Sequence, residues 1–242
     1  AARAALARTP ATPLPERLAL HWANHFTIGR ENYARYFAGA MEREAIRPHM
    51  LGRFHAMLRA CTTHPAMLFY LGNRSSIGPN SPVGRQTRRG LNENLGRELL
   101  ELHTLGVDGG YTQEDVIETA RILTGWTAWD EDGDPRTPGR IGFRPEMHEP
   151  GARTVLGRRY PEGGAEQLEA LLADLARHPA TARHVTRRMA RHFIGDAAPP
   201  ALLERMAAVF RETEGDLGAV TRAMVEHPAA WSTPPGKVRP PI

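Results

Sequence analysis

The chain has almost no cysteine and almost no lysine, and both shortages exclude kinds of site or partner. Cys61 is the single cysteine among 242 residues, which excludes an intrachain disulfide and a zinc site built on cysteines. Lys237 is the only lysine, so the 31 basic residues include 30 arginines. Against 27 acidic residues the formal net charge is only +4, and the arginines are spread along the whole chain. We therefore expect no nucleic-acid partner, because such proteins gather their basic residues on one face.

Long apolar runs and the common catalytic motifs are also missing. No segment approaches the roughly 18 consecutive apolar residues of a membrane-spanning helix, and residues 1–10 contain no apolar core of a signal peptide. The sequence has neither the GxxxxGKS loop of nucleotide hydrolases nor the GxSxG turn of serine hydrolases. Nucleophilic catalysis by serine or cysteine therefore has no visible signature.

Apolar residues repeat at helical spacing through most of the chain. Leu14, Leu18 and Trp22 recur at every fourth position, which is typical of an amphipathic helix. Thr112 and Asp115 form a capping-box pattern at the start of another helix. We expect an all-α, multi-helix array in a single domain over residues 1–242. The predicted helices span 14–26, 31–47, 54–63, 67–71, 91–105, 112–124, 165–177, 180–194, 200–213 and 217–226.

Residues 125–164 form an irregular insertion in this helical pattern, because glycine and proline are dense there. The candidate strands within it are 140–143 and 154–156, which predict one short β-hairpin. A segment this long and irregular inside a compact domain is usually functional or partly mobile.

The tripeptide His-Pro-Ala occurs three times, beginning at His64, His178 and His227. Proline fits the first position of a helix, and the residue before it is kept out of the helical conformation. A histidine at the end of the preceding helix also suits the negative end of that helix dipole. We interpret the three sites as helix–helix corners with structural histidines.

The helix predicted at 91–105 carries two carboxylates on one face. At about 100° per residue, Asn94, Glu98 and Glu101 fall on one stripe. Carboxylate and amide oxygens on one face can line a polar pocket or bind a divalent cation. The alternative is a solvated charged face, because Arg97 has a glutamate four residues before it and another four residues after it. An apolar stripe beside this face comprises Leu91, Leu95, Leu99 and Leu102.

His21 and His25 are four residues apart on a predicted helix, which is chelating spacing for zinc. His25 lies within the apolar stripe of that helix, whereas His21 lies at its edge. Without the glutamate of a HExxH pattern the pair is a weak metal signal, and a histidine on an apolar face is more often a core residue with a hydrogen-bond partner.

The segments RGLNEN at 89–94 and RELLELHTLGVDGGYT at 97–112 resemble the bacterial domain-of-unknown-function 1800 family. The resemblance covers nearly the whole chain and continues at WANHF (22–26), LTGW (123–126) and TVLG (154–157). His21 is not part of the family pattern, and Glu149 and Arg153 replace the Asp and Lys that are more usual there. The positions that the pattern includes are Trp22, Asn24, His25, Asn92, Asn94, Arg97, Glu98, Glu101, His103 and His148.

The resemblance implies a mostly helical bacterial protein that is exported to the periplasm or the medium. It also implies a partner protein encoded by a neighbouring gene. Members of the family are longer at both ends, so the resemblance implies that this chain is a fragment whose signal peptide has been lost. The family supplies no known reaction.

Two functions are consistent with these residues. The first is a hydrolase-like enzyme, because a carboxylate and a nearby histidine can act as general base and acid, and a divalent metal can join them. The second is a non-catalytic helical module that binds a partner protein or a glycan, with the charged cluster as a structural ion network. For the enzyme, the expected catalytic residues are Glu98, Glu101, His148 and His25, and the expected substrate-binding residues are Asn92, Asn94, Arg97 and Trp126.

Overall fold

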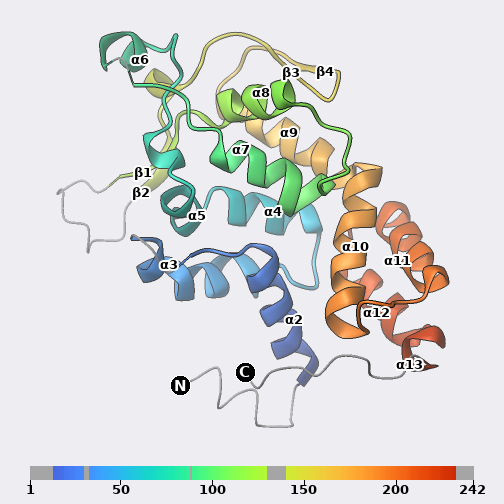
Figure 1. Ribbon diagram of the computed structural model, residues 1–242. Helices are drawn as coiled ribbons and strands as arrows, with labels where there is room; N and C mark the ends of the chain where they lie inside the picture. The colour runs from blue at the N-terminus through green and yellow to red at the C-terminus, as the bar shows by residue number, and fades with distance from the viewer. Residues whose placement is uncertain (1–12, 30–32, 88, 130–139, 233–242) are drawn as a thin grey trace.

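The computed structural model describes residues 13–29, 33–87, 89–129 and 140–232 (Figure 1). Helices dominate this part of the chain, which confirms the all-α prediction. The first half contains α2 (Pro13–His25), α3 (Ala34–Met41), η1 (Glu42–Ile46), α4 (Phe54–Thr62), α5 (Pro65–Tyr70), η2 (Asn73–Ser75), α6 (Pro82–Thr87), α7 (Asn94–Glu98), η3 (Leu99–Leu105) and α8 (Gln113–Leu123). The second half contains η4 (Pro145–Met147), α9 (Ala165–Arg177), α10 (Pro179–Phe193), α11 (Pro200–Glu212), α12 (Leu217–Glu226) and α13 (Ala229–Ser232).

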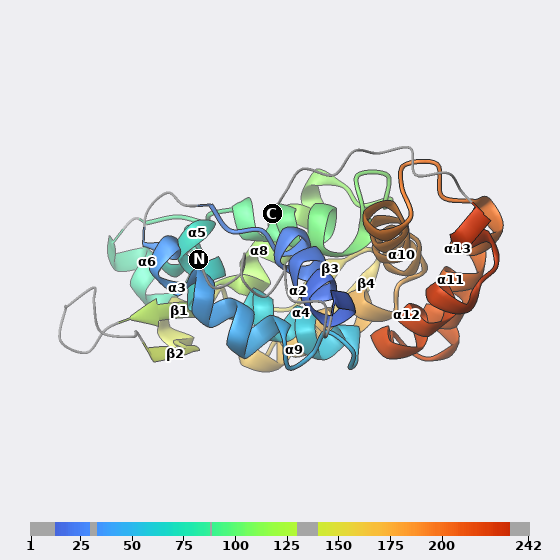
Figure 2. The same ribbon diagram turned by 90° about the horizontal axis from the view of Figure 1, so that it is seen from below.

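The helices surround a hydrophobic core that extends from α2 to α12. Phe54 of α4 links its parts, because its ring lies 6.4 Å from Phe26, which directly follows α2, and 5.7 Å from Phe210 of α11. The C-terminal helices α11 to α13 lie at one end of the molecule, and the strands β1 (Trp126–Trp129) and β2 (Arg140–Phe143) lie at the other (Figures 1 and 2). Within the described residues, no helix is long and apolar enough to cross a bilayer.

The helix predicted at 91–105 differs from a regular α-helix in its second half. The short helix α7 continues directly into η3, which is π-helical. Thr104 Oγ1 donates to the carbonyl of Leu99, five residues earlier, at 2.6 Å. A π-helix turns by less per residue than an α-helix, so the side chains rotate away from their predicted faces. The assignment of Leu102 to the apolar stripe is therefore wrong: its side chain is 37% exposed, whereas His103 and Thr104 are buried.

The insertion contains two hairpins instead of one. β2 (Arg140–Phe143) pairs with β1 (Trp126–Trp129), and β3 (Arg153–Val155) pairs with β4 (Arg158–Tyr160), both antiparallel. Leu156 and Gly157 between β3 and β4 have φ values of 51° and 74°, as a two-residue type I′ turn requires. The predicted strands and a short hairpin are confirmed, and each predicted strand pairs with a strand that was not predicted. Residues 130–139 of the insertion lie outside the described part.

The three His-Pro-Ala sites share one geometry. His64, His178 and His227 each accept a hydrogen bond at Nδ1 from the backbone N–H of the alanine two residues later, at 3.2 Å in every case. Proline is the first helical residue of α5 and α10 and directly precedes α13. At each site the histidine nitrogen satisfies an N–H that has no partner within the helix. The corners are confirmed, and the histidine nitrogen also caps the start of the following helix.

The crossing of α7 over α8 depends on Gly96. A Cβ atom at this position would lie 3.0 Å from both Val116 O and Ala120 N on α8. These neighbours are backbone atoms of a buried helix face, so they cannot move aside as a side chain would.

We expect Gly96→Val to lower the free energy of unfolding by about 2 to 3 kcal/mol, because the added methyl groups force α7 away from α8. Gly90→Val is the matched control: nothing lies within 4 Å of a Cβ there, and its effect should stay within about 0.5 kcal/mol. Urea unfolding of both variants measures the difference, and equal losses would contradict the close crossing.

Candidate functional site

The two predicted catalytic glutamates lie together at the junction of α7 and η3. Tyr111 Oη donates to Glu101 Oε2 at 3.0 Å. Burial and the nearby charge of Glu101 raise the pKa of Glu98, and burial together with the Glu101 hydrogen bond raises the pKa of Tyr111 to about 12. The group is thus a pair of neighbouring carboxyls beside a protonated tyrosine.

Arg97 belongs to a partly exposed network next to this pair. Its Nη2 donates to Glu93 Oε2 at 3.2 Å and to Gln113 Oε1 at 2.9 Å, and Gln113 Nε2 donates to the same Glu93 oxygen at 2.7 Å. The network joins the start of α8 to the residue before α7. Exposed pairs of this kind contribute little to stability.

The side-chain amide of Asn92 forms two hydrogen bonds to the backbone. Its Oδ1 accepts the backbone N–H of Asn94 at 2.9 Å, and its Nδ2 donates to the carbonyl of Leu71 at 3.2 Å. Asn92 therefore fixes the entry into α7, whereas the side chain of Asn94 is exposed.

His148 and Trp126 lie where the insertion packs against the end of α8. His148 Nδ1 donates to the carbonyl of Thr124 at 2.9 Å, and the backbone N–H of Glu149 donates to Thr124 Oγ1 at 2.8 Å. Trp126 is 8% exposed, and its ring lies 5.8 Å from that of Phe143. Both side chains are therefore buried in the packing of the insertion.

The structure does not bring the predicted catalytic residues into one network. Among the described residues, no hydrogen bond joins His25, Glu98 or His148 to another of the three. No group of three or more His, Cys, Asp or Glu side chains in the same residues is arranged to hold a metal ion.

His25 instead forms a hydrogen bond to the end of the π-helical segment η3. Its Nε2 donates to the carbonyl of His103 at 3.0 Å, and His184 Nε2 of α10 donates to the carbonyl of Leu102, also at 3.0 Å. The last carbonyls of a helix have no partner within it. Histidines from α2 and α10 thus supply the missing donors from two sides, and these hydrogen bonds hold both helices beside η3.

This arrangement gathers histidines around one arginine. Burial, followed by the charges of His192 and Arg188, lowers the pKa of His21 to about 3. Burial and Arg188 lower the pKa of His103 to about 3. Arg188 also lowers the pKa of His25 and His184, for which burial is again the largest cause. These four imidazoles are therefore neutral at pH 7, next to a permanent positive charge.

A cavity of about 510 Å³ opens between α2 and α10 at this point. His21 and Asn24 line it from α2. The lining residues from α10 are His184, Arg187, Arg188, Arg191 and His192. No carboxylate lines it, and Arg191 pairs with Asp196 at 2.5 Å. We call this cavity the Arg188 pocket.

The Arg188 pocket was not predicted, although α10 carries a signal for it. No acidic residue occurs between Arg177 and Asp196, and the basic residues of α10 recur three and four positions apart from His184 to His192. Such spacing gathers them on one helical face. The interpretation of the arginines as scattered is therefore wrong for this helix.

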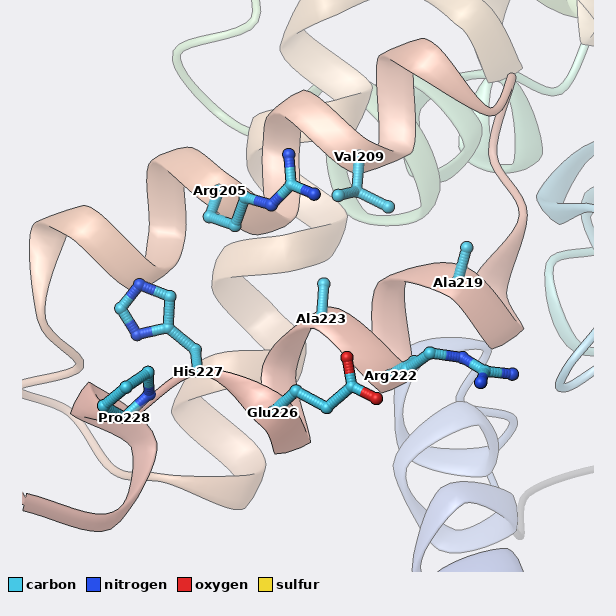
Figure 3. A pocket seen from close by; sticks show the side chains of 8 residues that line it. All are labelled: Arg205, Val209, Ala219, Arg222, Ala223, Glu226, His227 and Pro228. Carbon is cyan, nitrogen blue, oxygen red and sulfur yellow. The ribbon is translucent and has the colours of Figure 1, made fainter.

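A second cavity of about 400 Å³ lies between α11 and α12 (Figure 3). Arg205 and Arg222 line it together with Glu226, and Ala219 and Ala223 also contribute to its wall. Its charges have both signs, so it lacks the uniform basic character of the Arg188 pocket.

Comparison with known proteins gives one match. A family model described as "Protein of unknown function (DUF1800)" matches residues 1–242. No curated protein and no solved structure matches the chain significantly.

The buried neutral histidines make stability depend on pH. His103 has a pKa of about 3 in the folded protein and about 6.5 in the unfolded chain. The unfolded chain therefore binds the proton first, and the free energy of unfolding falls as pH drops from about 6.5 to about 3, by up to about 1.4 kcal/mol per pH unit for each such histidine.

We expect His103→Gln to reduce this dependence between pH 7.0 and 5.5, where a histidine in the unfolded chain takes up its proton. The hydrogen bond from His25 survives because it ends on the backbone of residue 103. Denaturant unfolding at several pH values measures the slope. His49→Gln, at a partly exposed histidine, is the matched control, and equal slopes in the wild type and His103→Gln would contradict the expectation.

Proposed function

The chain belongs to the DUF1800 family, which is described as one of unknown function, and we propose that it binds a small anionic ligand in the Arg188 pocket. The proposal concerns binding, and it is compatible with an enzyme that acts on such a ligand.

One observation carries the proposal: Arg188 is a half-buried cation with no carboxylate partner among the described residues. Its single hydrogen bond is a long one, 3.5 Å from Nη2 to the carbonyl of Asn24. Burial and the charge of Arg191 lower the pKa of Arg188. A partly desolvated charge without a counter-charge is unfavourable, and an anion in the pocket would supply that counter-charge.

The chemistry and size of the pocket favour a small molecule. Guanidinium groups present paired N–H donors that match the oxygens of a carboxylate or phosphate. A volume of about 510 Å³ falls in the range of about 300 to 1,000 Å³ that is usual for small-molecule sites. The ligand therefore needs an anionic head group and has room for a modest organic body.

The hydrolase prediction for Glu98, Glu101, His25 and His148 stays a prediction. The raised pKa of Glu98 beside Glu101 supports acid–base chemistry there, but neither of the two cavities described above is lined by that pair. The roles of Asn92, Asn94, Arg97 and Trp126 in substrate binding, the non-catalytic module, export, a metal and a neighbouring partner protein likewise stay predictions.

We expect Arg188→Met to weaken phosphate binding by about ten- to a hundredfold, because hydrogen bonds to a charged group contribute roughly 1.5 to 3 kcal/mol. The same variant should be as stable as the wild type or more stable without ligand, because it removes an uncompensated cation and keeps an apolar side chain. Calorimetric titration with phosphate and urea unfolding measure the two effects.

Arg85→Met is the control for this experiment. It removes the same charge from an exposed position on α6, so it should leave phosphate affinity within about a factor of two. Equal weakening in both variants would mean that the protein attracts phosphate only by its net charge. A large loss of stability in Arg188→Met would assign Arg188 to packing.

A further inference from the structure

The Arg188 pocket contains an imidazole nitrogen that has no hydrogen-bond partner. His21 is 3% exposed, and its Nε2 is buried without a partner in the part of the chain that the structure describes. The ring lies 5.1 Å from that of His192, on the opposite wall of the pocket. A buried polar atom without a partner is costly, so its place in a cavity lined by cations points to a ligand.

Resting on the proposed anion site, we propose that the pocket takes up a proton on His21 when its ligand binds, and therefore selects a dianionic head group such as that of a phosphate monoester. A protonated His21 Nε2 donates to the ligand and gains the partner that it lacks.

The groups that face His21 explain why it stays neutral without a ligand. On α2 they are Arg17 and His25, which lie one helical turn away on either side. From α10 the charges of His192 and Arg188 act on it, and the ring of Phe193 lies 6.0 Å away. The charges around His21 are thus positive, and Asp196 is engaged by Arg191.

An anion in the pocket places negative charge near His21 and so opposes the positive charges that keep its imidazole neutral. Negative charge between His21 and Arg188 favours the imidazolium form, so binding of the ligand and binding of the proton strengthen each other by the same factor. Affinity for a ligand of constant charge therefore rises as pH falls, by up to about tenfold per pH unit for one proton taken up.

The charge count favours a dianion over a monoanion. Arg187 and Arg188 have no carboxylate partner among the described residues, and an imidazolium at His21 adds a third positive charge. A monocarboxylate would leave most of this charge uncompensated. A phosphate monoester carries a charge of about −1.5 to −2 at neutral pH and offers three acceptor oxygens.

Titration calorimetry with sulfate tests the inference. Sulfate is a dianion that does not titrate between pH 5 and 8, so any proton taken up comes to rest on the protein. At pH 6.0, measurements in two buffers of different ionisation enthalpy should give uptake of about half to one proton per sulfate. Affinity for sulfate should rise at least about threefold from pH 7.5 to 6.0, and sulfate should bind at least about tenfold more tightly than acetate.

Substitutions test whether His21 is the residue that takes up the proton. His21→Asn keeps a donor in the pocket and should still bind sulfate, but without proton uptake and without the pH dependence. His49→Asn removes a histidine from another region and should behave as the wild type. If His21→Asn does not fold, the two-buffer measurement on the wild type still decides whether protons are taken up.

The outcomes separate this inference from the proposed function. If neither sulfate nor acetate binds the wild type at any pH, the anion site itself is refuted. If sulfate binds without proton uptake, if His21→Asn retains the uptake, or if acetate binds as tightly as sulfate, the site stands and the proton-linked selection of a dianion is overturned.

Discussion

The carbonyl groups at the end of η3 are the feature on which the rest of the site depends. A helix end leaves carbonyls without internal partners, and here the carbonyls of Leu102 and His103 accept from His184 of α10 and His25 of α2. Positions 25 and 184 are far apart in the chain, and the two hydrogen bonds bring their helices to the same turn. The space between α2 and α10 beside this turn is the Arg188 pocket.

Local spacing was sufficient to predict most of the fold. The capping box of Thr112 and Asp115 is present with both of its hydrogen bonds, and the helices α9 to α12 begin and end within a few residues of their predicted bounds. The π-helical segment was not predictable in this way, because Leu95, Leu99 and Leu102 satisfy the spacing of an ordinary helix. The turn between β3 and β4 needed positive φ at Leu156, where the sequence shows leucine instead of the usual asparagine or glycine.

The site was predicted less well than the fold, because it depends on contacts between helices that are distant in the sequence. The sequence indicated His25 and Glu101 as polar residues on helical faces, but the basic stripe of α10 was interpreted as part of a scattered distribution of arginines, and neither pattern specifies which helical faces pack together. Only the packing of α2 against α10 converts His21 and Arg188 into one pocket. Glu101, on η3, accepts a hydrogen bond from Tyr111 instead. Residue types revealed which groups were available for chemistry, and long-range contacts determined which of them lie together.

The choice of backbone carbonyls as partners for His25 and His184 has an electrostatic consequence. Carboxylates in their place would hold the rings equally well, but they would raise the pKa of both histidines and neutralise Arg188. The protein would then supply its own counter-charge, and an entering anion would have to displace it. A carbonyl orients an imidazole without adding a full negative charge, so the rings stay neutral and Arg188 stays uncompensated. The π-helical end of η3 thus fixes the geometry of the pocket while leaving its positive charge available to a ligand.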